Sequence, residues 1–434
     1  MQNLLSFRAA GVGTVLFASC LVFAPGARAS QPPPNQQTKQ TLFVDDDKKE
    51  CPWAQYTDLR AAAVAALPGA TILVCPGTYP GPIVVTRQLT FIAFTRGVAG
   101  GGDERDFDEN NGGARRRDAD DPSREAIVLA GPAGDGFTLV ADTAGTVITG
   151  FVISGSAQPV FDAGINIKDP SGTGYQILDN LITGNNVGMY FHSIGGKQSR
   201  IEGNAFVGNN AGGFPTPNTG TAIFTQGFQI NDTEIKHNYF EGHQDSALNL
   251  GDGSQHGLVI NANKSVNDST FLVLGRASGS VVSDNRIEGS STSGLYFFGQ
   301  NFGVLVAGNE LQAGPGNLSS GIRLTGPYFG AAGPNGQMSI ARNHVRNFGY
   351  GIRGSNVEDS VFDHNMVRDN SVDGIQMSPL TFIPATGNTL ADNDARDDAV
   401  YDCEDQSMGL GTAGTANFWR DDQGEKANPP GICH

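Results

Sequence analysis

The stretch "DNLITGNNVGMYF", residues 179–191, contains two short runs of alternating apolar and polar residues that are separated by a turn of Gly and Asn. The same pattern returns in "DNRIEGSSTSGLYFF" (284–298), "GNELQAGPGNLSSGIRL" (308–324) and "HNMVRDNSVDGIQM" (364–377). Alternation with a period of two predicts strands, and none of these runs is long enough for an amphipathic helix. The sequence therefore predicts a chain built from many short strands.

Anchor residues, usually Asn, mark each repeat and lie 22 to 34 residues apart. A period of about 20–50 residues is typical of a solenoid, whose coils bury their apolar residues only by stacking. Asn at the same turn of successive coils can hydrogen-bond along the stack and satisfy buried amides. The anchors are Phe151, Asn180, Asn204, Asn238, Asn263, Asn285, Asn309, Asn343, Asn365 and Asn388.

The repeat pattern resembles the right-handed parallel β-helix family, the pectin-lyase-like fold, from about residue 70 to residue 400. The resemblance implies an all-β solenoid of about ten coils, with parallel strands ~4.8 Å apart. It implies little about activity, because lyases, hydrolases, epimerases, adhesins and noncatalytic proteins share this fold.

The N-terminal 29 residues combine Arg8, an apolar stretch and "ARA" before Ser30, which predicts a secretory signal peptide and an exported protein. An Ala-rich segment at 57–69, with Thr57 as its expected N-cap, predicts a short helix that covers the first coil. The predicted organisation is a signal peptide (1–29), a flexible leader (30–50) and one β-helix domain (51–434), divided into an N-cap (51–80), an acidic insertion (100–125), regular coils (126–400) and a C-cap (401–434).

Four cysteines remain after removal of the signal peptide, and export favours two disulfides among them. About ten coils would hold the two ends ~45 Å apart, whereas disulfide-bonded Cα atoms lie ~5.5 Å apart. The sequence therefore predicts the pairs Cys51–Cys75 and Cys403–Cys433.

The formal net charge of −16 argues against nucleic acid as a partner, and no apolar segment after the signal peptide is long enough to span a membrane. The fold and the export signal instead favour a polysaccharide as the partner.

In a strand of the form Gly-Ile-x-Leu, the Ile and Leu point inward and x points outward, because side chains alternate along a strand. Arg323 and Arg353 are successive outward residues; Arg binds carboxylate or sulfate in a bidentate manner, and Tyr can stack on sugar rings. An acidic polysaccharide is thus the predicted ligand, and arginines that are solvated or paired with acids are the alternative. The expected outward column is Asn166, Tyr190, Ile223, Asn249, Leu272, Tyr296, Arg323, Arg353 and Gln376, of which Tyr190, Asn249, Tyr296, Arg323, Arg353 and Gln376 are the predicted substrate-binding residues.

His243 and Asp245 in an entry turn, together with Arg323, are the predicted catalytic residues of a polysaccharide lyase or uronate epimerase, since such chemistry needs a base and a charge neutraliser. Asp162 occupies the coil position of Asp245, and His192 follows a strand end. The paired-Asp and Gly-His-Gly signatures of polygalacturonases and the Asp-Pro-His-Asp motif of alginate epimerases are missing. A noncatalytic surface or glycan-binding protein is therefore the alternative.

Two turns are longer than the others, at 209–220 and 325–337, and they are expected to rim the outward column from opposite edges. In the acidic insertion, Asp106, Asp108 and Asn110 alternate as in the start of a calcium loop, but no Glu closes it at Arg117. Calcium is the only cofactor that the sequence suggests, and a charged loop without a metal is the alternative.

Overall fold

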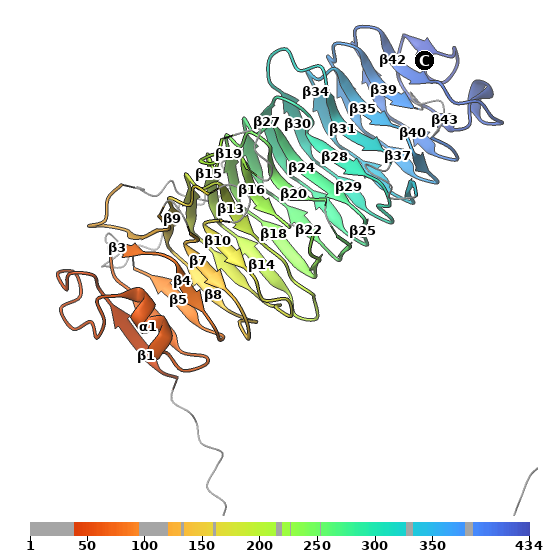
Figure 1. Ribbon diagram of the computed structural model, residues 1–434. Helices are drawn as coiled ribbons and strands as arrows, with labels where there is room; N and C mark the ends of the chain where they lie inside the picture. Colours follow the sequence, from red (N-terminus) through yellow and green to blue (C-terminus); the bar gives the residue numbers. More distant parts are fainter. Residues whose placement is uncertain are drawn as a thin grey trace, which may run out of the picture. The chain divides into compact units, whose positions relative to one another are not determined.

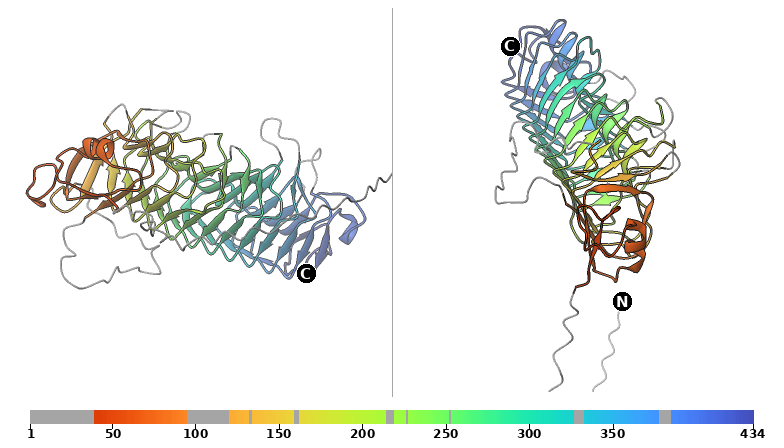
Figure 2. Two further views of the ribbon diagram at one scale, coloured as in Figure 1. Left: turned by 90° about the horizontal axis from the view of Figure 1, so that it is seen from below. Right: turned by 90° about the vertical axis from the view of Figure 1, so that its left-hand side faces the viewer.

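A computed structural model describes residues 39–94, 120–131, 134–158, 162–213, 219–225, 227–251, 253–326, 333–377 and 385–434. The predicted signal peptide, the first part of the leader (30–38) and most of the acidic insertion lie outside these residues. Residues 39–434 form one unit, in which successive coils stack along a common axis (Figures 1 and 2). No described helix is long and apolar enough to cross a membrane.

Most coils contribute one strand to each of three parallel sheets, here named sheets A, B and C, which hold 14, 12 and 13 strands in the described part of the chain. Sheet A contains β1 (Thr41–Val44), β2 (Thr71–Val74), β5 (Thr90–Ala93), β8 (Val147–Thr149), β11 (Gln176–Leu178), β14 (Ser199–Glu202), β18 (Thr233–Lys236), β22 (Val259–Asn261), β26 (Val281–Ser283), β29 (Leu305–Ala307), β33 (Ser339–Ala341), β37 (Val361–Asp363), β40 (Thr389–Ala391) and β43 (Phe418–Arg420). Sheet B contains β3 (Gly77–Pro80), β6 (Ala126–Leu129), β9 (Val152–Ser154), β12 (Leu181–Thr183), β15 (Ala205–Val207), β19 (Tyr239–Glu241), β23 (Lys264–Val266), β27 (Arg286–Ser290), β30 (Glu310–Ala313), β34 (His344–Arg346), β38 (Met366–Arg368) and β41 (Asp394–Arg396).

Sheet C is the third face of the solenoid, and two small sheets extend some of the turns. Sheet C contains β4 (Ile83–Val85), β7 (Phe137–Leu139), β10 (Ile165–Ile167), β13 (Val187–Tyr190), β16 (Thr221–Phe224), β20 (Ser246–Leu250), β24 (Thr270–Gly275), β28 (Leu295–Phe298), β31 (Ser320–Thr325), β35 (Tyr350–Gly354), β39 (Asp373–Met377), β42 (Tyr401–Asp405) and β44 (Ala427–Asn428). The small sheets are β17 (Ile230–Asn231), β21 (Gln255–His256) and β25 (Ala277–Ser278), and β32 (Asn335–Gly336) with β36 (Val357–Glu358).

The chain is thus a right-handed parallel β-helix, as the repeat predicts. The expected number of about ten coils was too low, because sheets A and C hold 14 and 13 strands among the described residues. The first coils, built from β1, β2 and β5, lack an anchor Asn and so were not counted.

Inward side chains form continuous apolar columns along the stack. In sheet A, Ile148, Ile177, Ile201, Ile235 and Ile260 lie in register on five successive strands and are fully buried. Burying a side chain of this size stabilises the fold by about 1.5–3 kcal/mol. Because each residue packs on its equivalents in the coils above and below, the core exists only in the stack.

A ladder of buried asparagines runs along the turn between sheets A and B. The Asn263 Oδ1 accepts hydrogen bonds from the backbone N and the Nδ2 of Asn238, at 3.0 and 3.1 Å, and its Nδ2 donates to the carbonyl of Ile235 at 2.8 Å. The residue before each Asn adopts a left-handed conformation, as at Ala262 (φ 52°). The members are Asn180, Asn204, Asn238, Asn263, Asn285, Asn309, Asn343, Asn365 and Asn393.

The predicted ladder is correct at its first member and wrong at its last. The backbone N of Phe151 donates to Asn180 Oδ1 at 3.0 Å, so the ladder begins there. The anchor Asn388 was wrong: it lies one turn earlier and pairs with Asn417, and Asn393 takes the ladder position instead. Asn388 precedes the apolar run Thr-Leu-Ala, whereas Asn393 precedes Asp-Ala-Arg, so the apolar pattern favoured the wrong Asn.

Both ends of the described stack are covered and cross-linked. The helix α1 (Leu59–Ala65) buries Leu59, Ala63 and the following Ala66, although Asp58 rather than Thr57 is its N-cap. The Cα atoms of Cys51 and Cys75 lie 6.4 Å apart and those of Cys403 and Cys433 lie 6.3 Å apart, which confirms the predicted disulfide pairs. At the far end, after the 3₁₀ turn η1 (Thr412–Gly414), the Trp419 side chain is buried and its Nε1 donates to Asp405.

Replacing one ladder residue tests the dependence of the stack on these bonds. Asn263→Ala should lower the free energy of unfolding by about 3 kcal/mol, because it removes the acceptor of the buried Asn238 backbone N and the side-chain donor to the Ile235 carbonyl. The matched control is Asn261→Ala, whose side chain bonds to Ser283 and Asp284 at the surface and should cost less than about 1 kcal/mol. Equal shifts in urea unfolding would contradict the ladder's role.

Buried carboxylates, rather than amides, end two ladders at the C-terminal side. Asp422 accepts from Asn393, and Asp398 accepts from the backbone N and the Nδ2 of Asn370 at 2.7 and 2.8 Å. Burial raises the pKa of Asp398 to about 7 and that of Asp422 to about 6. The Oδ2 of Asp398 is buried without a hydrogen-bond partner, which also favours the protonated acid.

The pKa of Asp398 predicts a stability that falls as the pH rises. In the unfolded chain the group has its usual pKa of 3.8, so between about pH 4 and 7 the folded state holds a proton that the unfolded state releases. Stabilisation by this proton is complete below pH 4 and is lost as the pH passes 7. Asp398→Asn should therefore be neutral near pH 4 and stabilise by about 1–3 kcal/mol at pH 8. Thermal unfolding of both proteins across this range checks it, and a pH-independent difference would contradict it.

Candidate functional site

The outer face of sheet C carries a column of side chains in register, here named the outer column. It is fixed by the strand pairing, so its members are spaced by the strand separation of ~4.8 Å. All six predicted substrate-binding residues lie in it. Its members are Asn166, Tyr190, Phe224, Asn249, Val273, Tyr296, Arg323, Arg353, Gln376 and Glu404.

Two expected members of the column were wrong by one residue. Ile223 and Leu272 are fully buried, and Phe224 and Val273 take the outward positions. In these two strands Thr stands near the place of the opening Gly, so the Gly-Ile-x-Leu pattern could not be aligned from the sequence.

The two arginines of the column are held against aromatic rings. The guanidinium carbon of Arg323 lies 5.0 Å from the ring centre of Tyr296, and that of Arg353 lies 4.4 Å from the ring centre of Tyr350. Such cation–π contacts are worth about 0.5–1 kcal/mol at exposed sites and restrict the side chains that make them. No ion pair joins either arginine to a carboxylate within the described part of the chain.

A polar network continues the column beyond Arg353. Its Nε donates to Oε1 of Gln376 at 2.7 Å, and the Nε2 of Gln376 donates to Asp373 at 2.9 Å and to Glu404 at 2.5 Å. Asp373 and Glu404 are buried, with exposed fractions of 2% and 6%. Burial, reinforced by the charge of Glu404, raises the pKa of Asp373 to about 6. Neither acid was predicted as a site residue, although Asp373 directly precedes the Gly374 that opens its strand.

The N-terminal part of the same face is also polar but is already neutralised. Asp135 accepts from the Nδ2 of Asn166 at 3.0 Å and from the Nζ of Lys168 at 3.2 Å. Asp162 lies beside this group, and burial followed by the charge of Asp135 raises its pKa. Tyr190 is buried at 2% exposure, and burial raises the pKa of its phenol.

The structure does not bring the three predicted catalytic residues together. Asp245 lies at the start of β20, where its Oδ2 accepts from Thr221 and Ser246 at 3.0 and 3.1 Å. Three strand-to-strand steps separate it from Arg323 on β31, a distance of about 14 Å along the stack. Asp245 and Arg323 therefore share a face without sharing a reaction centre.

His243 lies in the expected turn, but its side chain points into the core and not toward the outer face. It is 1% exposed, its Nδ1–H donates to Asp268 at 2.7 Å, and its Nε2 accepts from the Nδ2 of Asn209 at 3.1 Å. The residue thus occupies a position in a second ladder, after Asn185 and Asn209. His192 is likewise buried beside the Asp169 carbonyl, and burial lowers its pKa.

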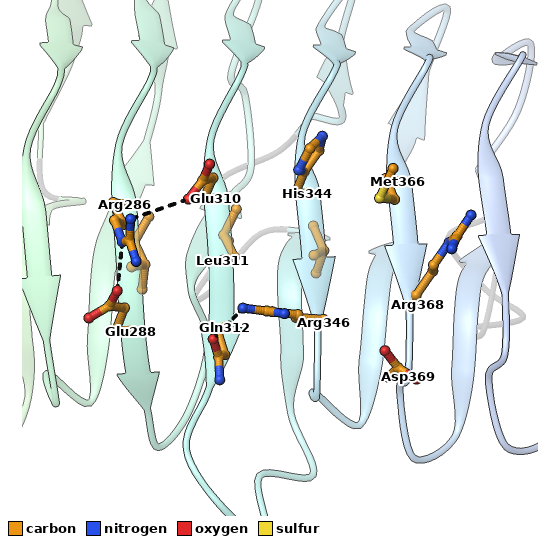
Figure 3. A pocket seen from close by; sticks show the side chains of 12 residues that line it. Arg286, Glu288, Glu310, Leu311, Gln312, His344, Arg346, Met366, Arg368 and Asp369 are labelled. Atoms are coloured by element: carbon orange, nitrogen blue, oxygen red, sulfur yellow. Dashed lines mark hydrogen bonds and ion pairs between the residues drawn. The ribbon is translucent and has the colours of Figure 1, made fainter. Parts of the chain in front are cut away.

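A groove of about 300 Å³ lies on sheet B, away from the predicted site (Figure 3). Arg286 pairs there with Glu288 at 2.6 Å and with Glu310 at 3.9 Å, while Arg346 reaches the neutral Gln312. Arg368, in register with Arg346, pairs with Asp394. Most charges of this groove are neutralised by neighbours, so the outer face of sheet C is the stronger candidate site.

Other predicted features fall partly or wholly outside the described residues. The possible calcium ligands Asp106, Asp108 and Asn110 lie outside them, as do 214–218 and 327–332 of the two enlarged turns. The calcium loop and the rim therefore stay predictions.

The sequence matches no protein-family model and no curated protein. Among solved structures, a mannuronic acid specific polysaccharide family 6 lyase from human gut microbiota is 11% identical, with a TM-score of 0.53, and the match covers 88% of this chain and 86% of that one. The catalytic domain of a GH87 α-1,3-glucanase in complex with nigerose is 11% identical, with a TM-score of 0.52 and coverage of 92% and 70%. At these identities the likeness shows the fold alone.

The ladder position of His243 predicts which replacements it tolerates. His243→Asn should preserve the fold, because an amide can accept from Asn209 and donate to Asp268 as ladder asparagines do. His243→Leu should lower the free energy of unfolding by about 2–3 kcal/mol, because it removes one buried hydrogen bond from each of Asn209 and Asp268. Urea unfolding measures both. Loss of ligand retention in a stably folded His243→Asn protein would instead favour a role at the site.

Proposed function

We propose that this protein is an exported β-helix protein of pectin-lyase-like architecture that binds a polysaccharide along the outer face of sheet C. The observation that carries the proposal is the run Tyr296, Arg323, Arg353 and Gln376 on four successive strands. Aromatic rings and planar donors in one line suit a linear ligand with repeated sugar rings. Two disulfides and the predicted signal peptide support export.

The proposed ligand carries carboxylate or sulfate groups. Arg323 and Arg353 form no ion pair among the described residues, in a chain whose formal net charge is −16. A guanidinium that is fixed over an aromatic ring and lacks an anionic partner is prepared for a bidentate contact with such a group. The lyase and the glucanase act on polysaccharides by their names, which supports a polysaccharide as the ligand in general.

Turnover of the bound polysaccharide is the second part of the proposal, with a noncatalytic binding protein as its alternative. Asp373, with a pKa of about 6, can exchange a proton at neutral pH. The side chain of Gln376 bridges Asp373 to Arg353 by hydrogen bonds. A lyase or epimerase needs such a proton acceptor beside a charge neutraliser. The deep burial of Asp373 and Glu404 instead favours the binding protein.

Removing both arginines tests the binding site. Arg323→Ala with Arg353→Ala should weaken retention on acidic polysaccharides such as polyuronates at least tenfold, because each charge-assisted contact is worth about 1.5–3 kcal/mol. Affinity electrophoresis or calorimetry with polyuronate, sulfated and neutral glycans measures this. The matched control is Arg346→Ala with Arg396→Ala on sheet B, which removes the same charge from another face. Equal losses in the two variants would point to nonspecific charge attraction and contradict the site.

The same glycan panel separates an enzyme from a binding protein. New reducing ends, unsaturated products or epimerised sugars, lost in Asp373→Asn, would establish turnover at this face. Retention without any product would establish the binding protein. If no glycan is retained at all, the proposed function is wrong.

A further inference from the structure

A loop of high charge density joins β1 to the N-terminal disulfide. Residues 45–50 read DDDKKE, four acids and two lysines, so the loop carries two net negative charges. Its side chains lie far along the chain from the outer column, and the proposed function does not use them. Lys48 adopts a left-handed conformation (φ 61°), which turns the loop tightly and brings the acids together.

Three carboxylates of this loop converge on one point. One oxygen each from Asp45, Asp47 and Glu50 lies within 4.8 Å of the others. Oxygens at that separation can all reach one Ca²⁺ ion at the usual distance of about 2.3–2.6 Å. Ca²⁺ suits this arrangement better than Mg²⁺, since it accepts six to eight oxygens in irregular geometry and Mg²⁺ demands a near-ideal octahedron.

Asp45 supplies an independent reason to expect a cation. The residue has no solvent exposure, and although its Oδ2 accepts from the Cys51 backbone N at 2.5 Å, its Oδ1 is buried without a hydrogen-bond partner. A buried carboxylate oxygen left without a partner is costly, and a cation would satisfy it directly. Lys49 pairs with Asp47, but its side chain is 77% exposed and free to turn away when a metal binds.

We propose that Asp45, Asp47 and Glu50 bind one calcium ion that fastens the N-terminal cap of the β-helix. The ion completes the coordination of Asp45 and joins the loop to the Cys51–Cys75 disulfide, because Asp45 accepts from the Cys51 backbone. The site is distinct from the possible calcium loop at Asp106–Asn110, and it does not depend on glycan binding.

Calorimetric titration of the chelator-treated protein with CaCl₂, and separately with MgCl₂, tests the site. We expect one calcium site with a dissociation constant of about 0.1–1 mM, as in extracellular calcium modules, and weaker binding of Mg²⁺. Asp47→Asn with Glu50→Gln, both outside the core, should weaken calcium binding at least tenfold while circular dichroism stays unchanged. Asp45→Asn should do the same if it folds.

The matched control is Asp106→Asn with Asp108→Asn, which removes the same charge from the other predicted calcium loop and should leave calcium binding at Asp45, Asp47 and Glu50 unchanged. Unaltered calcium binding in the Asp47→Asn, Glu50→Gln protein would overturn the assignment. So would the absence of calcium binding in the unmodified protein, or its loss in the control variant alone.

Discussion

At the turn between sheets A and B, the regular coils pass through a left-handed residue and then bury the backbone N–H of a ladder Asn. Only the next coil supplies an acceptor for this N–H. The Oδ1 of the following ladder Asn accepts hydrogen bonds from both the backbone N and the side-chain Nδ2 of the Asn before it, as Asn263 does for Asn238. Because nearly every coil repeats the arrangement, the register of one strand determines that of the next. The positions of the outer residues, and so the candidate site, follow from this constraint.

Features that repeat in space could be predicted because they also repeat in the sequence. The asparagines and their spacing give the stack, and the length of the stack then separates the two pairs of cysteines. Asn388 was misplaced because the apolar run Thr-Leu-Ala follows it, whereas the true ladder residue Asn393 is followed by Asp-Ala-Arg. Ile223 and Leu272 were misplaced because their strands lack the Gly that marks the register elsewhere.

The direction in which a side chain points from a turn was harder to predict than the position of its residue in the coil. His243 lies in the turn that the spacing predicts. The neighbouring sequence does not reveal that its imidazole ring takes the place of a ladder amide and bonds to Asn209 and Asp268 of other coils. Asp373 and Glu404 escaped notice for a related reason. Their significance depends on a contact through the side chain of Gln376 between two residues that lie 31 positions apart in the sequence.

Gln376 also keeps unlike charges apart. A direct pair between Arg353 and the two acids would neutralise the guanidinium, whereas the amide accepts from the arginine on one side and donates to the acids on the other. These partners fix the orientation of the Gln376 amide. If the amide were flipped, its NH₂ would face the Nε–H of Arg353 and its oxygen would face the two carboxylates.

Each coil packs only on the coils next to it, so the length of the stack can change without altering the other coils. Duplication of one coil would extend the ladder and the outer column by a single strand step of ~4.8 Å, while both disulfide-bonded ends stay as they are. The reach of the protein along a chain-like ligand is thus a modular trait, adjustable in whole steps by gene rearrangement without redesign of the remaining molecule.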